Sequence, residues 1–209
     1  MLNLEKNFFK KRILIYGLGK SGLSTYSFLK KNNVISLFDD RIIAKKKTKD
    51  SNTTYKEIIK KEFDCIIISP GIDINKCKLS RFLKKNHKKI YTDLDIFYSR
   101  YAFNQKITIT GTNGKSTTAK LLHDILKDQK KDVRLVGNIG NPILLEKKIK
   151  KDTLFVIEAS SYQLEYSKLF KTNISIILNI TPDHLERHKT INKYVSAKFK
   201  LIKNQSKND

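Results

Sequence analysis

Short apolar runs alternate with helix-like stretches along most of the chain, and this alternation constrains the fold more than any other feature. Short runs that are apolar on both faces and separated by helices are typical of parallel sheets covered by helices. The sequence therefore predicts an α/β protein. The predicted strands span residues 12–17, 34–39, 64–69, 89–92, 106–110, 133–137, 153–159 and 174–180, and the predicted helices lie near residues 21–31, 55–62, 76–86, 93–101 and 115–127.

The connector Tyr101–Gln105, with the sequence YAFNQ, separates two series of these elements. The first series opens with a strand followed by GLGKSG, as in dinucleotide-binding folds. The second opens with a strand followed by GTNGKS, as in phosphate-loop proteins. We therefore predict a Rossmann-like N-terminal domain over residues 1–101 and a P-loop α/β central domain that begins at residue 106.

Glycine and proline are rare in this chain, and their positions indicate where ligands bind. The eight glycines and three prolines lie in short loops at residues 17–22, 69–71, 111–116, 137–142 and 181–183. Each glycine-bearing loop follows a predicted strand, and ligands of open α/β sheets bind beyond the carboxyl ends of the strands. Glycine is needed where φ is positive or where a ligand approaches the backbone closely. Together the loops favour binding sites over ordinary turns.

The chain of 209 residues has a formal net charge of +23, a value that usually prompts a nucleic-acid hypothesis. The excess of basic residues is spread over both halves of the chain instead of forming one patch. We therefore favour solvated lysine faces and expect no nucleic-acid partner. The densest basic run, Lys45–Lys49, is predicted to be a loop.

The cysteines and the apolar runs indicate the cellular compartment in which the protein is expected. Cys65 and Cys77 lack the spacing of a metal or redox motif, and Cys65 lies in an apolar strand pattern that predicts a buried thiol. Free thiols indicate a reducing compartment. The N-terminus has no secretory signal pattern, and no apolar run approaches the length of a membrane span. We expect a cytoplasmic protein with no membrane partner.

The segment TGTNGKST has the most specific chemical pattern in the chain. Backbone amides at Gly111–Lys115 and the N-terminus of the following helix can bind an anion. Lys115 can reach the β- and γ-phosphates of a nucleotide, and the hydroxyl of Ser116 or Thr117 can ligate Mg²⁺. The common P-loop pattern would place glycine where this chain has Ile109, so the loop is a shorter variant.

The segment GLGKSG has the G-x-G-x-x-G pattern between a predicted strand and a predicted helix, and Asp39 and Asp40 end the next strand. Taken alone, this arrangement suggests a nicotinamide dinucleotide site. A single fingerprint of this kind has low specificity. A nicotinamide-dependent oxidoreductase is therefore one open alternative, and a basic nucleic-acid-binding protein is another, which a steep salt dependence of affinity would favour.

Several segments together resemble the Mur ligases, enzymes that join an amino acid to a carboxylate at the expense of ATP. TGTNGKST resembles the ATP-binding loop of this family and of the related folylpolyglutamate synthases, which are a third alternative. The resemblance runs from near Ile13 to Leu201, and SSYQL is its most discriminating segment. The segments similar to motifs of the D-glutamate-adding branch are EASSYQLE (Glu158–Glu165), NITPDHLERH (Asn179–His188), SPGI (Ser69–Ile72) and GNIGNP (Gly137–Pro142).

The resemblance implies an activity, the ATP-dependent addition of D-glutamate to UDP-N-acetylmuramoyl-L-alanine through an acyl phosphate, in peptidoglycan precursor synthesis. It also implies ATP and two Mg²⁺ ions as cofactors, and a monomer. Complete members of the branch are longer and carry a third domain that supplies the D-glutamate site. The resemblance therefore implies that residues 106–209 are the N-terminal part of a central domain, and that the isolated chain is inactive in the complete reaction.

The resemblance also implies roles for individual residues. The ATP-binding residues would be Gly111, Thr112, Asn113, Gly114, Lys115, Ser116 and Thr117. The residues that bind the UDP-substrate would be Leu18, Asp39, Asp40, Ser69, Gly71 and Asn138, with Lys20 or Ser21 as further donors. The metal ligands would be Ser116, Glu158, His184 and a carbamate on Lys198, and the catalytic residues would be Lys115, His184 and Lys198. The other histidines, expected to be structural or exposed, are His87, His123 and His188.

Two of these roles have physical requirements that a structure can test. Glu158 ends a predicted strand, where a carboxylate can hold the Mg²⁺ that bridges nucleotide phosphates. Lys198 must be neutral to react with CO₂, so we expect it in a partly buried site with a lowered pKa.

Overall fold

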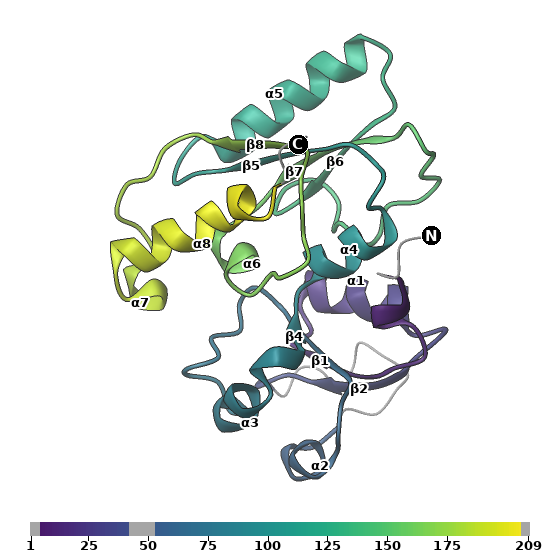
Figure 1. Cartoon of the computed structure of the whole chain (residues 1–209), viewed down its shortest axis with the longest axis vertical. Coiled ribbons are helices and arrows are strands. Elements are labelled where there is room, and N and C mark those ends of the chain that lie inside the picture. Colours follow the sequence, from purple (N-terminus) through teal and green to yellow (C-terminus); the bar gives the residue numbers. More distant parts are fainter. Residues whose placement is uncertain (1–4, 42–52, 206–209) are drawn as a thin grey trace. The chain divides into compact units, whose positions relative to one another are not determined.

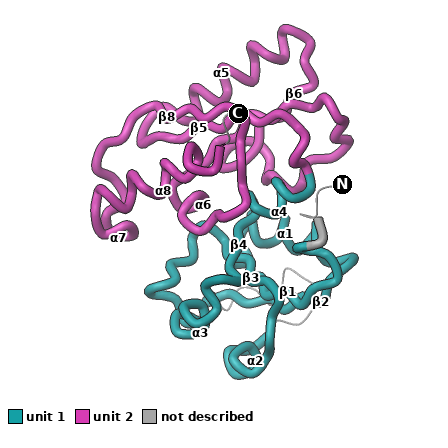
Figure 2. The backbone as a smooth tube through the Cα atoms, in the orientation of Figure 1, with its two compact units in different colours: residues 1–100 teal, residues 101–209 magenta. Residues whose placement is uncertain are grey.

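The computed structural model describes residues 5–41 and 53–205, which form two compact units (Figure 2). Unit 1 comprises residues 1–100 and unit 2 comprises residues 101–209. The run Lys45–Lys49, predicted to be a loop, lies outside the described residues. In the part of the chain that the structure describes, no helix is long and apolar enough to cross a membrane.

Unit 1 is built on a sheet of four parallel strands in the order β2-β1-β3-β4. Its strands are β1 (Arg12–Tyr16), β2 (Val34–Phe38), β3 (Cys65–Ile68) and β4 (Ile90–Tyr91). Its helices are α1 (Lys20–Leu29), α2 (Tyr55–Lys60), α3 (Ser80–Lys85) and α4 (Asp93–Arg100), with short 3₁₀ turns η1 (Glu5–Phe8) and η3 (His87–Lys89). The central strands β1 and β3 are buried on both faces, which explains why they are apolar throughout, and the thiol of Cys65 is buried as predicted.

Unit 2 contains a second sheet of four parallel strands, in the order β6-β7-β5-β8. Its strands are β5 (Lys106–Thr110), β6 (Val133–Gly137), β7 (Leu154–Glu158) and β8 (Ile174–Ile177), and its helices are α5 (Lys115–Asp128), α6 (Ser161–Glu165), α7 (Leu185–His188) and α8 (Ile191–Lys203). Helix α5 packs on one face of the sheet, while α6 and α8 lie on the other face (Figure 1). The core between α5 and the sheet includes Ile109, Ala119, Val133 and Val156.

The predicted parallel α/β architecture is confirmed, and every predicted strand is present. The largest difference concerns the helix predicted over residues 76–86, of which only Ser80–Lys85 is helical. The preceding segment turns instead, with the amide of Cys77 donating to the carbonyl of Asp73 and the carboxylate of Asp73 accepting from the amide of Asn75. Aspartate that bonds to a nearby backbone amide favours a turn over a helix.

We expect a methyl group at Gly22 to destabilise unit 1. A Cβ at Gly22 would lie 1.8 Å from the carbonyl oxygen of Gly17, whereas a Cβ at Gly19 would meet no atom within 4 Å. Inside a helix, alanine is usually more favourable than glycine by about 1 kcal/mol. Here the clash makes the replacement of glycine by alanine destabilising. Gly22→Ala should lower the free energy of unfolding of unit 1 by about 3 kcal/mol, in the range of severe overpacking.

Amide hydrogen exchange in β1 and β3 measures this change in unit 1 separately from unit 2. Gly19→Ala, at the N-cap of α1, is the matched control and should change the free energy by less than about 1 kcal/mol. Equal protection in Gly22→Ala and the wild type would contradict the close approach of α1 to Gly17.

Candidate functional site

The carboxyl ends of β5, β7 and β8 lie at one edge of the sheet in unit 2, where the predicted phosphate loop is found. The loop joins β5 to α5, and Gly111 and Gly114 in it have φ angles of 153° and 83°. Gly114 is the N-cap of α5, a helix of 14 residues whose N-terminus carries partial positive charge. The backbone therefore has the strand–loop–helix form that phosphate binding requires.

Glu158 ends β7 and places a buried carboxylate at this edge, with 1% of its surface exposed. Its Oε2 accepts a hydrogen bond of 2.8 Å from Oγ of Ser116, and its Oε1 accepts one of 3.0 Å from Nδ2 of Asn138. Both donors are neutral, so neither cancels the charge of the carboxylate. A carboxylate beside a hydroxyl suits Mg²⁺, which takes one or two carboxylates together with phosphate and water oxygens. Asn138, predicted as a substrate contact, thus lies beside a predicted metal ligand.

The segment that follows β8 is bonded directly to the phosphate loop. Oδ1 of Asn179 accepts from the amide of Asn113 at 2.9 Å, and Nδ2 of Asn179 donates to the carbonyl of Asn113 at 3.2 Å. The hydroxyl of Thr112 lies 3.2 Å from the carbonyl of Thr181, to which it donates, and accepts from the amide of Thr181 at 3.0 Å. These bonds hold residues 179–181 against the loop.

His184 comes next in the chain and packs among aromatic rings. Its ring centroid lies 4.8 Å from that of Tyr162 and 6.3 Å from that of Tyr194. The hydroxyl of Tyr194 in turn lies 3.0 Å from the hydroxyl of Thr112 in the phosphate loop. Nε2 of His184 is 3.4 Å from the carboxylate of Asp183. Tyr194 therefore connects His184 to the phosphate loop.

Lys198 is buried on α8 and also contacts the loop. Its Nζ donates to the carbonyl of Gly111 at 2.7 Å and lies 4.5 Å from the ring centroid of Tyr194. Burial, and after it the positive charge of Lys115, lowers the pKa of Lys198 to about 8. Lys115 folds back over the loop, with its Nζ donating to the carbonyl of Thr112 at 2.6 Å. Lys198 therefore meets the requirement of a partly neutral, buried amine.

The structure brings the predicted residues of unit 2 to one edge of one sheet. Lys115 and Ser116 begin α5 directly after the loop, and Glu158 is bonded to Ser116. Lys198 is bonded to the loop at Gly111, and His184 is connected to the loop through Tyr194. Lys115 and Ser116 carry a cation and a hydroxyl, and Glu158 carries an anion, so the edge offers complementary groups to a phosphate chain and a divalent cation.

The carboxyl ends of β1, β2 and β3 carry the predicted binding residues of unit 1. The amide of Leu18 donates to Oδ2 of Asp39 at 2.6 Å, and Oγ of Ser69 donates to the carbonyl of Gly17 at 2.7 Å. Gly71 follows Ser69 in the same turn. Side-chain-to-backbone bonds therefore tie the loops after three neighbouring strands to one another.

Asp40 and Ser21 take part in bonds that the sequence did not predict. Oδ1 of Asp40 accepts from the hydroxyl of Tyr16 at 2.6 Å. The hydroxyl of Ser21 donates to Asp93, a buried carboxylate whose pKa is raised by burial. The hydroxyl protons of Ser21 and Ser69 are thus both bonded within unit 1.

The side chains at the edge in unit 2 that were not predicted as site residues include Tyr162, His188 and Tyr194. His188, expected to be structural or exposed, is buried, and its Nε2 lies 3.0 Å from Oγ of Ser161. Tyr194 and Lys198 are four residues apart on one helix, so they share a face. That spacing is the sequence signal that could have identified Tyr194.

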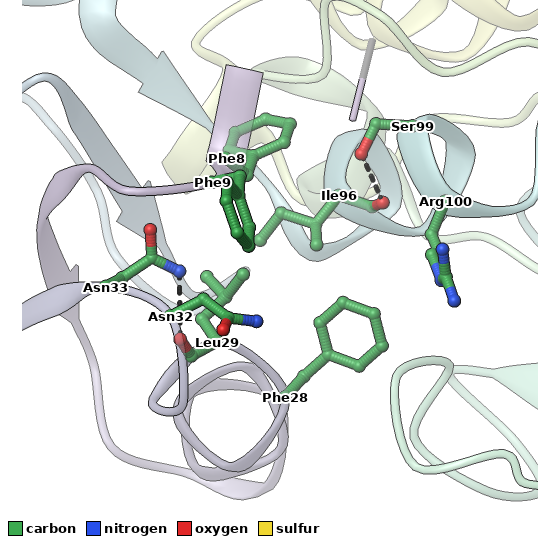
Figure 3. Close-up of a pocket in the computed structure, with 9 residues that line it drawn as sticks. All are labelled: Phe8, Phe9, Phe28, Leu29, Asn32, Asn33, Ile96, Ser99 and Arg100. Carbon is green, nitrogen blue, oxygen red and sulfur yellow. Dashed lines mark hydrogen bonds between the residues drawn. The ribbon is translucent and has the colours of Figure 1, made fainter. Parts of the chain in front are cut away.

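A cavity of about 510 Å³ opens in unit 1 between η1, α1 and α4 (Figure 3). It is lined by Phe8, Phe9, Phe28, Leu29, Asn32, Asn33, Ile96, Ser99 and Arg100. Most of these residues precede β1 or β2 or end α1 or α4, so the cavity lies at the amino ends of the strands. It is therefore separate from the glycine loops, which follow the carboxyl ends.

These features define a class of protein with two parallel α/β units, the second of which has a phosphate loop beside a buried carboxylate. Two family models match the chain, the Mur ligase MurD-like N-terminal domain over residues 11–90 and the Mur ligase middle domain over residues 109–209. The chain therefore belongs to the Mur ligase family.

The chain is similar to curated proteins named UDP-N-acetylmuramoylalanine–D-glutamate ligase. It is 37% identical to the protein of Caldicellulosiruptor bescii, over 93% of this chain and 45% of that protein. It is 36% identical to the Rickettsia bellii protein, over 95% of this chain and 44% of that protein. It is 38% identical to the Wolbachia pipientis protein, over 96% of this chain and 40% of that protein. The chain thus spans less than half the length of these relatives.

A solved structure with a similar fold is the UDP-N-acetylmuramate:L-alanyl-γ-D-glutamyl-meso-diaminopimelate ligase of Neisseria meningitides. The TM-score is 0.59, and the match covers 94% of this chain and 69% of that chain at 14% identity. At this identity the likeness shows the fold alone, which agrees with the α/β architecture described above.

Proposed function

We propose that this chain forms the UDP-substrate-binding and ATP-binding parts of a ligase that adds D-glutamate to UDP-N-acetylmuramoyl-L-alanine. The observation that carries the proposal is the hydrogen bond from Ser116 to Glu158, which joins the phosphate loop to a buried strand-end carboxylate. Relatives at 36–38% identity bear the name of this activity. The chain covers only 45% of the Caldicellulosiruptor bescii protein, so the complete reaction is itself proposed. Ligand binding by this chain is what can be tested directly.

In the proposed reaction the substrate carboxylate attacks the γ-phosphorus of ATP and releases ADP, which gives an acyl phosphate. The amine of D-glutamate then attacks the acyl carbon and displaces phosphate. A carboxylate and a triphosphate repel each other, so the site must neutralise negative charge. The loop amides of Gly111–Lys115 and the N-terminus of α5 bind phosphate oxygens, and Lys115 supplies a positive charge near the γ-phosphate.

The proposed metal ligands are Ser116 and Glu158 for one Mg²⁺ and His184 for a second. When bound, these ions supply further neutralisation of the phosphate charge. The fit rests on the buried carboxylate of Glu158, which accepts hydrogen bonds from the neutral side chains of Ser116 and Asn138, and on the hydroxyl oxygen of Ser116 beside it.

We also propose that Lys198 carries a carbamate in the ligase. A neutral amine adds to CO₂ and releases a proton, and the lowered pKa of Lys198 supports this reaction near neutral pH. The product is an anion that can bind or position the second Mg²⁺ with His184. The position of Lys198, bonded to the carbonyl of Gly111, puts this anion next to the phosphate loop.

For unit 1 we propose the UDP part of the substrate as the ligand, within a domain over residues 1–101 that precedes the ATP-binding domain over residues 106–209. The proposal is supported by the MurD-like N-terminal match and by the gathering of the predicted residues at the strand ends. The residues proposed to bind it are Leu18, Asp39, Asp40, Ser69 and Gly71.

We expect Lys115→Ala to weaken binding of MgATP about 10- to 100-fold, because a hydrogen bond to a charged group contributes roughly 1.5–3 kcal/mol. Titration calorimetry on the chain measures the affinity. Lys120→Ala is the matched control, since Lys120 lies on the same helix but forms an exposed ion pair with Asp124. Equal affinities of the two variants for MgATP would contradict the role of Lys115.

We expect UDP-N-acetylmuramoyl-L-alanine to bind unit 1 and UDP to compete with it, because the glycine loops present backbone groups to a nucleoside diphosphate. NMR shift changes at the amides of Leu18 and Gly71 would locate the ligand. NADH and a folate serve as controls that should cause no such changes. Shift changes with NADH but not with UDP would favour a nicotinamide-dependent oxidoreductase. Shift changes with the folate would favour a folylpolyglutamate synthase.

We expect a carbamate ¹³C resonance when ¹³C-bicarbonate is added at pH 8, and expect Lys198→Met to remove it. With a pKa of about 8, about half of the Lys198 amine is neutral at that pH, against roughly 0.4% of an ordinary lysine. Since the neutral form reacts, the resonance should weaken as the pH falls below 8. Lys203→Met, on the exposed side of the same helix, should retain it; a resonance that survives Lys198→Met would refute the assignment.

A further inference from the structure

Helix α7 holds His184 at its start, but its own sequence does not explain its conformation. It has four residues, and an isolated helix of this length is unstable in water. Two non-glycine residues with positive φ flank it, His184 at 53° and Lys189 at 69°. Each such residue costs about 1 kcal/mol or more. Tertiary contacts must therefore stabilise the conformation of this segment.

His188 makes the buried contact between α7 and α6. His188 and Ser161 are 3% and 2% exposed, and Nε2 of His188 lies 3.0 Å from Oγ of Ser161. The ring of His188 stacks on that of Tyr162, with centroids 5.6 Å apart and planes inclined by 24°. The same tyrosine ring lies 4.8 Å from the ring of His184. One aromatic ring thus contacts both histidines.

Other contacts support the pairing of the two helices. The hydroxyl of Tyr162 donates to Glu186 at 3.1 Å, and Nε of Arg187 donates to Glu165 at 3.0 Å. The guanidinium of Arg187 also lies 5.2 Å from the ring centroid of Tyr162. These contacts fix the middle of α7, whereas His188 joins its last residue to Ser161, the first residue of α6.

We propose that His188 is a positioning residue for His184. Its hydrogen bond to Ser161 and its stacking on Tyr162 hold the His184 ring at a fixed place relative to Glu158. The inference rests on the function proposed above, in which Glu158 and His184 hold metal ions. It also gives a physical role to Ser161 and Tyr162, two residues of the segment SSYQL.

Helix α6 is suited to this task because it starts directly after β7. Ser160 is its N-cap and forms a capping box with Gln163, so the start of the helix is fixed two residues after Glu158. A rigid element that begins beside one proposed metal ligand therefore sets the position of the other. Partners of this kind, which orient a ligand without binding the metal, typically change metal affinity 10- to 100-fold when removed.

The position of His184 can be measured without a metal ion. The ring current of Tyr162 shifts the ring-proton NMR resonances of His184, because the two rings are 4.8 Å apart. In the full chain, His188→Ala should move these resonances toward the values of an unstructured histidine. His188→Gln, which keeps a group able to bond Ser161, should restore most of the shift. Unchanged resonances of His184 in His188→Ala would overturn the proposal.

His123→Ala is the matched control, because His123 lies on α5 and pairs with Asp124. It should leave the His184 resonances in place. If His123→Ala moved them as far as His188→Ala does, the shift would report a general loosening of unit 2 and the proposal would fall.

ATP binding measured with Mn²⁺ as the probe metal tests whether the position of His184 affects metal binding. His188→Ala should weaken Mn²⁺-dependent ATP binding about 10-fold or more, and should leave ATP binding in EDTA unchanged. An equal loss in EDTA would mean that His188 only maintains the fold, and would overturn the proposal. If His184→Ala left Mn²⁺-dependent binding unchanged while His188→Ala still moved the His184 ring, the proposed metal role of His184 would fail and the positioning role would stand.

Discussion

The site in unit 2 depends on one buried carboxylate, that of Glu158. A buried carboxylate with neutral hydrogen-bond donors is costly, because neither hydroxyl nor amide replaces the charge stabilisation of water. The backbone that carries it is held by β6, where a Cβ at Gly137 would lie 2.2 Å from the carbonyl of Glu158 and the amide of Asn138 donates to that carbonyl. The strand end is thus fixed, and its side chain is aimed at Ser116. A cation would relieve this cost, so the buried carboxylate of Glu158 is suited to bind Mg²⁺.

Both units fix their glycine loops in the same way. In unit 1, Asp39 accepts the amide of Leu18, and in unit 2, Asn179 bonds to both backbone groups of Asn113. In each case a side chain at the end of one strand is bonded to the backbone of the loop after a neighbouring strand. A loop ordered in this way loses little entropy when a ligand arrives, which favours binding.

The sequence predicted the strands and the phosphate loop because apolar runs and glycine positions are local signals. Helices α6 and α7 have five and four residues, too few for a hydrophobic period, and they depend on contacts such as His188 to Ser161 that span 27 residues. The bond between Ser21 and Asp93 spans 72 residues and was likewise invisible.

The candidate site was predicted unevenly for the same reason. Lys115, Ser116 and Glu158 follow from the loop pattern and the strand end. Composition could not separate Lys198 from the other lysines, and its selection came from the family resemblance; its burial and its lowered pKa are properties of the folded chain alone. The roles assigned to these residues stay predictions.

The positive charges of Lys115 and Lys198 couple ATP binding to carbamate formation in the proposed site. Lys115, which we propose binds phosphate, also helps to lower the pKa of Lys198 and so increases the neutral fraction of its amine. ATP at the loop would bring negative charge close to both lysines, raise the pKa of Lys198 and oppose formation of a carbamate. Since such coupling is reciprocal, a carbamate already present would weaken binding of metal-free ATP. One ammonium group cannot offset both anions, so the proposed Mg²⁺ ions would supply the remaining positive charge in the proposed site.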